Sequence, residues 1–208
     1  TPEYEILSGL VGSEMCIRDR YFEIRPMVVG ETEVDLGITI DIDDPKEVGA
    51  DRVVNAVAAL DRYKGSLIVV DFGTATTFDV VDGDGTYRGG VIAPGINLSL
   101  EALYNAAARL PRISISETKT SEPSTKISKV IGKSTKAAMH SGIFWGYIGL
   151  IEGIVTRIKH EFAKPMTVIG TGGLASIFYD ATDSIDHIDE DITNAGLVLI
   201  YKRNLPWK

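Results

Sequence analysis

The chain has 208 residues, of which 44% are hydrophobic, and it carries 21 Lys and Arg against 29 Asp and Glu, a formal net charge of −8. This composition suffices for one large domain or two small ones, and the acidic balance argues against nucleic-acid binding because it repels a polyphosphate backbone. No apolar run reaches the roughly 18 residues that span a bilayer and no basic-then-apolar leader opens the sequence, so we expect a cytoplasmic protein without membrane contact. A single cysteine, Cys16, excludes an intramolecular disulfide and a cysteine-rich metal site.

The first 20 residues look foreign to the rest of the chain. Residues 8–20 keep neither helical nor strand periodicity, and the run VGSEMCIRDR resembles a translated sequencing adaptor. We therefore exclude residues 1–20 from fold reasoning, the alternative being an ordinary amphipathic lead-in.

From residue 21 onward the hydrophobic pattern predicts regular elements. Short strands are expected at residues 27–29 and 38–42, the second with apolar and polar residues alternating. A helix is expected over residues 51–63, with an apolar stripe toward the core and with Asn55 and Asp61 facing away.

Residues 66–72, 76–81 and 87–92 predict three antiparallel strands. The first two are β-branched runs, and Gly83-Asp84-Gly85 supplies the positive φ angles that a tight hairpin needs before the third.

Helices dominate the remainder of the predicted order. Pro94 and Gly95 start a helix to about residue 109, whose buried face we assign to Leu98, Ala102 and Leu103. A loop is expected over 111–128, followed by a long helix over 134–164 in which Gly142, Gly146 and Gly149 are sites of close helix approach or of substrate access. The later elements are a strand over 166–169, a short helix after Gly172, a strand over 185–188 and a closing helix over 191–202.

The most specific motif is VDFGTATTFD, residues 70–79. It places a carboxylate, Asp71, at a strand end and follows it with Gly73 and several threonine hydroxyls. Such a turn can bind phosphate through its amides and hydroxyls, while the carboxylate holds a cation. Alone, the motif also has a plain interpretation as a Thr-rich hairpin between core strands.

A second motif, Val48-Gly49-Ala50-Asp51-Arg52, precedes the first predicted helix. Its plain interpretation is an N-cap followed by a surface cation. An acid beside a guanidinium is also what a kinase needs, one group to accept a hydroxyl proton and one to bind an anionic substrate.

Together with Ser134-Thr135 through Ala138 to Ser141-Gly142, these two segments, written here as DPKEVGADR and DFGTATT, resemble type III pantothenate kinases. The similarity covers residues 21–204. It implies an α/β, actin-like fold of two RNase H-like halves that uses ATP and Mg²⁺ with a monovalent cation, K⁺ or NH₄⁺, to phosphorylate pantothenate in the first step of coenzyme A biosynthesis, as a homodimer. By position, the implied roles are Asp51 as general base, Gly49, Ala50, Asp51, Arg52 and Thr135 as pantothenate contacts, Asp71 as ligand of the monovalent cation, and Gly73, Thr74, Gly170, Gly172 and Gly173 as ATP contacts.

The chain departs from the family pattern at its start. The family's first phosphate loop, Asp-x-Gly-Asn-Thr/Ser after a strand, has no counterpart before Asp71, so we expect an incomplete first half. Residues 21–64 are then the remnant of the first half-domain and residues 65–208 the second. Asp44 also replaces the family's usual Asn, without expected consequence.

Two other glycine motifs are weaker. Gly132-Lys133-Ser134-Thr135 ends like a P-loop, but Ile127 stands where that loop needs glycine. Residues 170–175 fit a dinucleotide-binding GxGxxA pattern but leave too little chain for the βαβ units that should follow. The remaining alternatives are another actin-like small-molecule kinase and a catalytically silent nucleotide-binding regulator.

Overall fold

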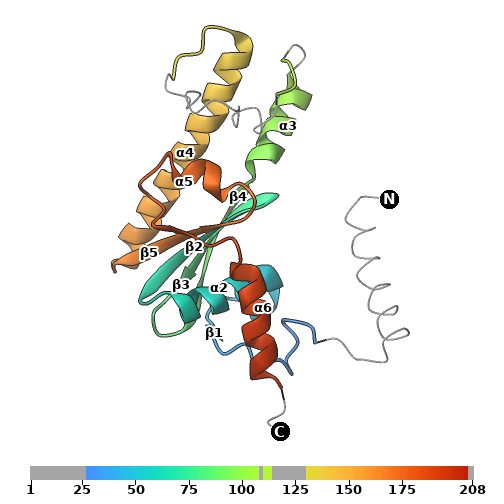
Figure 1. Cartoon of the computed structure of the whole chain (residues 1–208), viewed down its shortest axis with the longest axis vertical. Helices are drawn as coiled ribbons and strands as arrows, with labels where there is room; N and C mark the ends of the chain where they lie inside the picture. The colour runs from blue at the N-terminus through green and yellow to red at the C-terminus, as the bar shows by residue number, and fades with distance from the viewer. Residues whose placement is uncertain (1–26, 108–109, 114–129, 206–208) are drawn as a thin grey trace, which may run out of the picture.

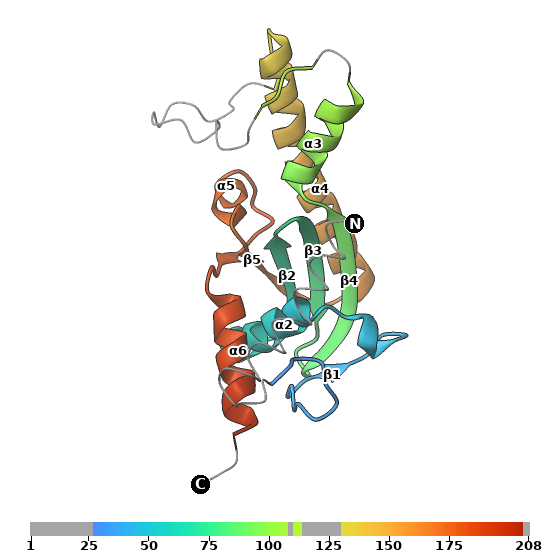
Figure 2. The same cartoon turned by 90° about the vertical axis from the view of Figure 1, so that its right-hand side faces the viewer.

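A computed structural model describes residues 27–107, 110–113 and 130–205, which form one six-stranded sheet in the order β1-β4-β3-β2-β5-β6 with helices on both faces (Figures 1 and 2). The elements in chain order are β1 (Thr39–Ile40), a 3-10 turn (Pro45–Glu47), α2 (Ala50–Arg62), β2 (Ser66–Phe72), β3 (Ala75–Val81), β4 (Thr86–Pro94), α3 (Ile96–Ala106), α4 (Thr135–Phe162), β5 (Met166–Thr171), α5 (Ala175–Tyr179), β6 (His187–Ile188) and α6 (Ile192–Arg203).

The sheet combines an antiparallel meander with parallel strands on both sides of it, since β1 also lies parallel to β4. β2, β3 and β4 pair antiparallel, β5 lies parallel to β2, and β6 lies parallel to β5. The predicted α/β, actin-like fold class is confirmed.

Each face of the sheet has its own core. Ile68, Val70 and Phe72 of β2 point toward α3, α4 and α5, whereas Leu67 and Val69 point toward α2 and α6. Because both faces are covered, β2 is a continuous apolar run instead of an alternating strand, which explains why its prediction matched its bounds.

Three predicted details of the fold are wrong. Residues 27–29 form no strand, because Glu31 N donates to Val28 O and Gly30 at φ +100° closes a turn there. Asn55 is buried and does not face away from the core, because Asp71 of β2 accepts a hydrogen bond from its side chain. Helix α3 buries Ile96 and Leu100 in place of the expected face, and its apolar residues lie on both sides, so periodicity could not choose between them.

Other predictions fall outside the described residues or remain open. Residues 1–20, which we predicted to be foreign, lie outside the described residues, as does most of the loop predicted over 111–128. The division at residue 64 also stays a prediction; α2, on its N-terminal side, packs against both the sheet and α6. No helix in the described part of the chain combines the length and apolar character needed to cross a membrane.

Candidate functional site

The candidate site lies where β2 and β5 end and α2 begins. Because these two strands are parallel, their carboxyl ends meet at one edge of the sheet, with Asp71 paired in register to Thr171. The N-terminal turn of α2 supplies Asp51 and Arg52, and Gly49 is its N-cap residue with extended ψ. Two motifs about 20 residues apart in sequence are thus brought together at this edge.

Asn55 joins the two motifs physically. Its side-chain Nδ2 donates to Asp71 Oδ2 at 3.1 Å, and its Oδ1 accepts from Thr193 Oγ1 of α6 at 2.7 Å. Asp51 lies one helical turn before Asn55, so it is on the same face of α2 as the residue that holds Asp71. Asp51 and Asp71 therefore share one side of the molecule, as the kinase hypothesis requires.

The electrostatics agree with this proximity. Burial raises the pKa of the Asp71 carboxyl above its ordinary value, and the negative charges of Asp51 and Asp79 add to that rise, while the Asn55 hydrogen bond opposes it. A half-buried carboxylate near two others favours a cation beside it. Asp51 itself is exposed, and its Oδ1 accepts from the Arg52 backbone N–H at 2.9 Å.

The glycines at this edge allow backbone to pass close to the acidic group. Gly172 has φ +89°, and a Cβ there would lie 2.6 Å from Asp71 Oδ1 and 2.8 Å from Phe72 N. Gly173 faces open space, so the two adjacent glycines differ in what they permit. Across the edge, the turn of Gly73 and Thr74 is closed by bonds from Gly73 N to Ala75 O and from Gly95 N to Thr74 O.

Comparison with known proteins decides the family. Residues 10–157 match the sequence profile of the family described as type III pantothenate kinase. The chain is 60% identical to the type III pantothenate kinase of Rhodospirillum rubrum over 187 residues, which are 90% of this chain and 69% of that protein. It is also 60% identical to that of Paramagnetospirillum magneticum over 89% of this chain and 68% of the relative. The chain belongs to the type III pantothenate kinase family.

A solved structure supports the fold alone. A protein from Campylobacter jejuni titled as a conserved putative Baf family transcriptional activator superposes with a TM-score of 0.56 at 23% identity, covering 81% of this chain and 70% of that one. The family's sequence similarity spans the Asp51 and Asp71 motifs, which lie inside the matched residues.

Among the residues named for this family, Thr135 is not joined to the others. It is exposed in the first turn of α4, whose N-cap Ser134 accepts from Ala137 N at 3.2 Å. The start of α4 and all of α3 project beyond the sheet (Figures 1 and 2). None of the contacts within the described ranges connects Thr135 with the loop of residues 49–52.

Sequence reasoning assigned no role in the site to three residues, Asp79, Tyr87 and Asn55. Arg52 Nε donates to Asp79 Oδ1 at 2.7 Å, and Tyr87 Oη donates to the same oxygen at 2.7 Å. Asn55 is the third. Asp79 closes the VDFGTATTFD motif, and a carboxylate inside a β-branched strand was a signal that could have pointed to a buried partner.

Resident metal sites made by protein side chains alone are absent from the part of the chain described. No group of three or more His, Cys, Asp or Glu side chains is arranged to hold an ion there. Mg²⁺ in kinases usually takes one or two carboxylates and completes its shell with substrate phosphates and water. Asp51 and Asp71 supply hard oxygen donors of that kind at the site edge, so the donor chemistry fits such an ion.

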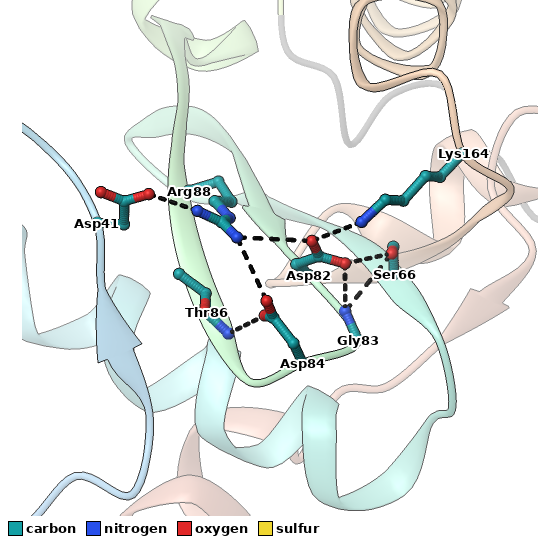
Figure 3. A network of polar contacts seen from close by, with 8 residues as sticks. All are labelled: Asp41, Ser66, Asp82, Gly83, Asp84, Thr86, Arg88 and Lys164. Carbon is teal, nitrogen blue, oxygen red and sulfur yellow. Dashed lines mark hydrogen bonds and ion pairs between the residues drawn. The ribbon is translucent and has the colours of Figure 1, made fainter.

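A second polar cluster lies at the opposite end of the meander, at the β3–β4 turn (Figure 3). Asp82 accepts from Lys164 Nζ at 2.8 Å, from Ser66 Oγ at 2.9 Å and from Gly83 N at 2.8 Å. Arg88 lies beside Asp82 and also pairs with Asp41 and Asp84. This cluster connects the loop after α4 to the β3–β4 hairpin. Asp71 pairs with Thr77 near the start of β3, whereas Asp82 follows the end of that strand.

Proposed function

We propose that this protein is an ATP-dependent transferase that phosphorylates the primary hydroxyl of pantothenate to 4′-phosphopantothenate, the first step of coenzyme A biosynthesis. Membership in the family supplies the reaction class. The structural observation that carries the proposal is the shared edge of Asp51 and Asp71, tied through Asn55.

Asp51 is the proposed general base. It is exposed in the first turn of α2, where a substrate hydroxyl can reach it, and its Oδ1 accepts a hydrogen bond from the Arg52 backbone N–H. Asp51 accepts the hydroxyl proton as the substrate oxygen attacks the γ-phosphoryl group, and ADP leaves. Positioning and charge neutralisation supply most of the rate in such transfers.

Gly49, Ala50, Asp51 and Arg52 form the proposed pantothenate loop. The guanidinium of Arg52 suits the substrate's carboxylate, because a planar fork of N–H donors matches two carboxylate oxygens. Thr135 is the further proposed pantothenate contact. Since the start of α4 stands apart from this loop in one copy of the chain, that role needs a rearrangement or a second copy.

The ATP side of the site is proposed at the two glycine turns. Gly73 and Thr74 follow β2, Gly170 lies near the end of β5, and Gly172 and Gly173 follow that strand, so both glycine turns lie at the carboxyl ends of two parallel strands. Asp71 is the proposed ligand of K⁺ or NH₄⁺, because burial among other acids makes a cation favourable there. Mg²⁺ supplies neutralisation of the phosphate oxygens when bound.

The proposed assembly is a cytoplasmic homodimer. Leu98 and Leu103 of α3 are 48% and 37% exposed, and a side chain at Gly142, Gly146 or Gly149 of α4 would meet no atom within 4 Å. An apolar, closely approachable surface on two projecting helices favours packing against a second copy.

The test is product formation by the full-length enzyme. With ATP, Mg²⁺ and K⁺, pantothenate should give 4′-phosphopantothenate and stoichiometric ADP, detected by mass spectrometry and a coupled ADP assay. A panel of acetate, glycerol and hexoses should give at most background turnover. Preference for one of those substrates would indicate another actin-like kinase, and ATP binding without any turnover would indicate a silent regulator.

A further inference from the structure

Asp79, which no role in the reaction yet includes, contacts the proposed pantothenate-binding arginine directly. Arg52 Nε donates to Asp79 Oδ1 at 2.7 Å, across 27 positions of sequence. The Asp79 side chain is fully buried, while 15% of the Arg52 side chain remains exposed. Solvent therefore does not reach the Asp79 side of the ion pair, whereas it reaches part of the Arg52 side chain.

Asp79 is itself held from two further directions. Tyr87 Oη donates to Asp79 Oδ1 at 2.7 Å, and Thr77 Oγ1 donates to Oδ2 at 2.9 Å. Both carboxylate oxygens are thus occupied by donors from β3 and β4. A carboxylate fixed in this way presents Arg52 with an acceptor in one position only.

The sheet is shaped to make room for this arrangement. Asp79 pairs in register with Gly90, and the β3–β4 register shifts between Asp79 and Val81. Such irregularities re-aim a side chain relative to a regular strand. A Cβ at Gly90 would lie 2.0 Å from Phe78 O and 3.0 Å from Arg52 Nη2, so the neighbouring strand requires glycine here, and the guanidinium packs beside it.

Asp79 hydrogen-bonds only one of the three guanidinium nitrogens of Arg52. Guanidinium has five N–H donors, and within the described residues Asp79 engages it through Nε alone, with the Tyr87 ring 5.9 Å below the guanidinium carbon. Among the described residues neither Nη group has a hydrogen-bond partner, and the two groups form one flat edge of the fork whose geometry matches a carboxylate. Burial raises the pKa of Asp79 above its ordinary value, while the Tyr87, Arg52 and Thr77 contacts oppose the rise.

We infer that Asp79 is a positioning residue, which with Tyr87 and Thr77 holds Arg52 by Nε so that its Nη edge is presented to the carboxylate of the acid substrate. This inference rests on the proposed function and extends it from the loop of residues 49–52 to a buried support on the sheet. The alternative is an ion pair that only stabilises the fold.

The experiment compares steady-state constants of the complete enzyme and its variants. Asp79→Asn should raise the KM for pantothenate by about tenfold or more and leave the KM for ATP within about twofold, because only the acid substrate meets Arg52. Tyr87→Phe keeps the ring and removes the hydroxyl, and it should raise the same KM by about threefold to fivefold. Should Asp79→Asn be recovered unfolded, Tyr87→Phe decides the matter.

Asp82→Asn is the matched control. Asp82 is also a buried acid just beyond the end of β3, also ion-paired, but it lies in the cluster at the far turn (Figure 3). It should lower thermal stability without changing the KM for pantothenate. A fold-stabilising role alone predicts that Asp79→Asn and Asp82→Asn behave alike.

A double-mutant cycle separates action through Arg52 from independent action. Arg52→Ala alone should raise the KM for pantothenate, and adding Asp79→Asn to it should raise that KM by less than about twofold more. Full additivity of the two changes would overturn the inference. A wild-type enzyme inactive on pantothenate would instead overturn the proposed function, whereas an active one with unchanged KM in Asp79→Asn and Tyr87→Phe would leave the function intact and remove the positioning role.

Discussion

Asn55 donates a hydrogen bond from Nδ2 to Asp71 Oδ2 at 3.1 Å and accepts one at Oδ1 from Thr193 at 2.7 Å. One amide therefore connects α2, β2 and α6 in the buried layer behind the site. An amide suits the position because it offers a donor to the acid and an acceptor to the hydroxyl at the same time. The relationship fixes how the first turn of α2 lies relative to the end of β2.

Replacing Asn55 should destabilise the fold. Asn55→Ala removes the only described side-chain donor to Asp71 and leaves a half-buried carboxylate and a hydroxyl without their partner. We expect the free energy of unfolding to fall by about 1–3 kcal/mol, measured by urea denaturation. Asn194→Ala, an exposed position on α6, should stay within about 0.5 kcal/mol of wild type. Equal effects of the two changes would argue against the bridge.

The general base can be tested through the balance of kcat and KM. Asp51→Asn keeps the size of the side chain and its acceptor for the Arg52 amide but cannot take a proton at neutral pH. In the complete enzyme kcat should fall by about 100-fold or more, while the KM for pantothenate changes by less than about threefold. Asp61→Asn, exposed near the end of the same helix, should keep full turnover. Unchanged turnover in Asp51→Asn would remove the residue from this role.

Gly172 and Gly173 offer a pair of adjacent positions with opposite expectations. Gly172→Ala must adopt φ near +89° with Cβ 2.6 Å from Asp71 Oδ1, so the unfolding free energy should fall by about 1–3 kcal/mol. Gly173→Ala meets open space and should change stability by less than about 0.5 kcal/mol. Thermal unfolding followed by circular dichroism measures both. A stable Gly172→Ala protein would show that the turn after β5 can relax.

Local chemistry made much of this arrangement predictable from the sequence. Asp71 and Gly73 indicate a polar turn after a buried strand, and Asp51 follows a glycine at the start of a helix. The sequence therefore placed one motif correctly at the end of β2 and the other at the start of α2. What joins them was not found. Asn55 is a polar residue that we placed with Asp61 on the outer side of the helix, and nothing local shows that a half-buried acid 16 positions later would accept a hydrogen bond from its amide.

The same limit explains the missed support of Arg52. Its partner Asp79 is 27 positions away on β3, next to a shift in the β3–β4 pairing register. Pairing register depends on the whole sheet and cannot be derived from a single strand pattern. The prediction that Leu98 is buried was wrong for another reason. Periodicity identifies an apolar face, but α3 carries apolar residues on both sides. The helix also projects past the sheet, which therefore does not cover both sides.

The proposed dimer depends on that exposed side of α3. Leu98→Asp places a charge in an apolar surface that is 48% exposed in one copy, so it should leave the monomer folded and shift the mass from dimer to monomer. Multi-angle light scattering coupled to size exclusion measures the mass. Val198→Asp, the same kind of change on the exposed side of α6, should leave the mass unchanged. A Leu98→Asp protein that remains dimeric would move the interface elsewhere.

The Asp82 cluster predicts how stability responds to acid. The Lys164 ammonium, followed by the Ser66 hydroxyl and the Gly83 amide, holds the pKa of Asp82 below its ordinary value. A carboxyl whose pKa is lower in the folded than in the unfolded state stabilises the fold fully above the unfolded value, about 3.9, and loses that contribution as pH falls through the folded value. The wild type should therefore exceed Asp82→Asn in stability at pH 6, and the difference should shrink steadily below about pH 4. Urea midpoints measured from pH 6 to pH 2 test this, and Lys164→Met should reduce the same difference whereas Lys159→Met should not. A gap between wild type and Asp82→Asn that stays constant across this range would mean that Asp82 stabilises the hairpin by packing and neutral hydrogen bonds, because only the ionised form can pair with Lys164.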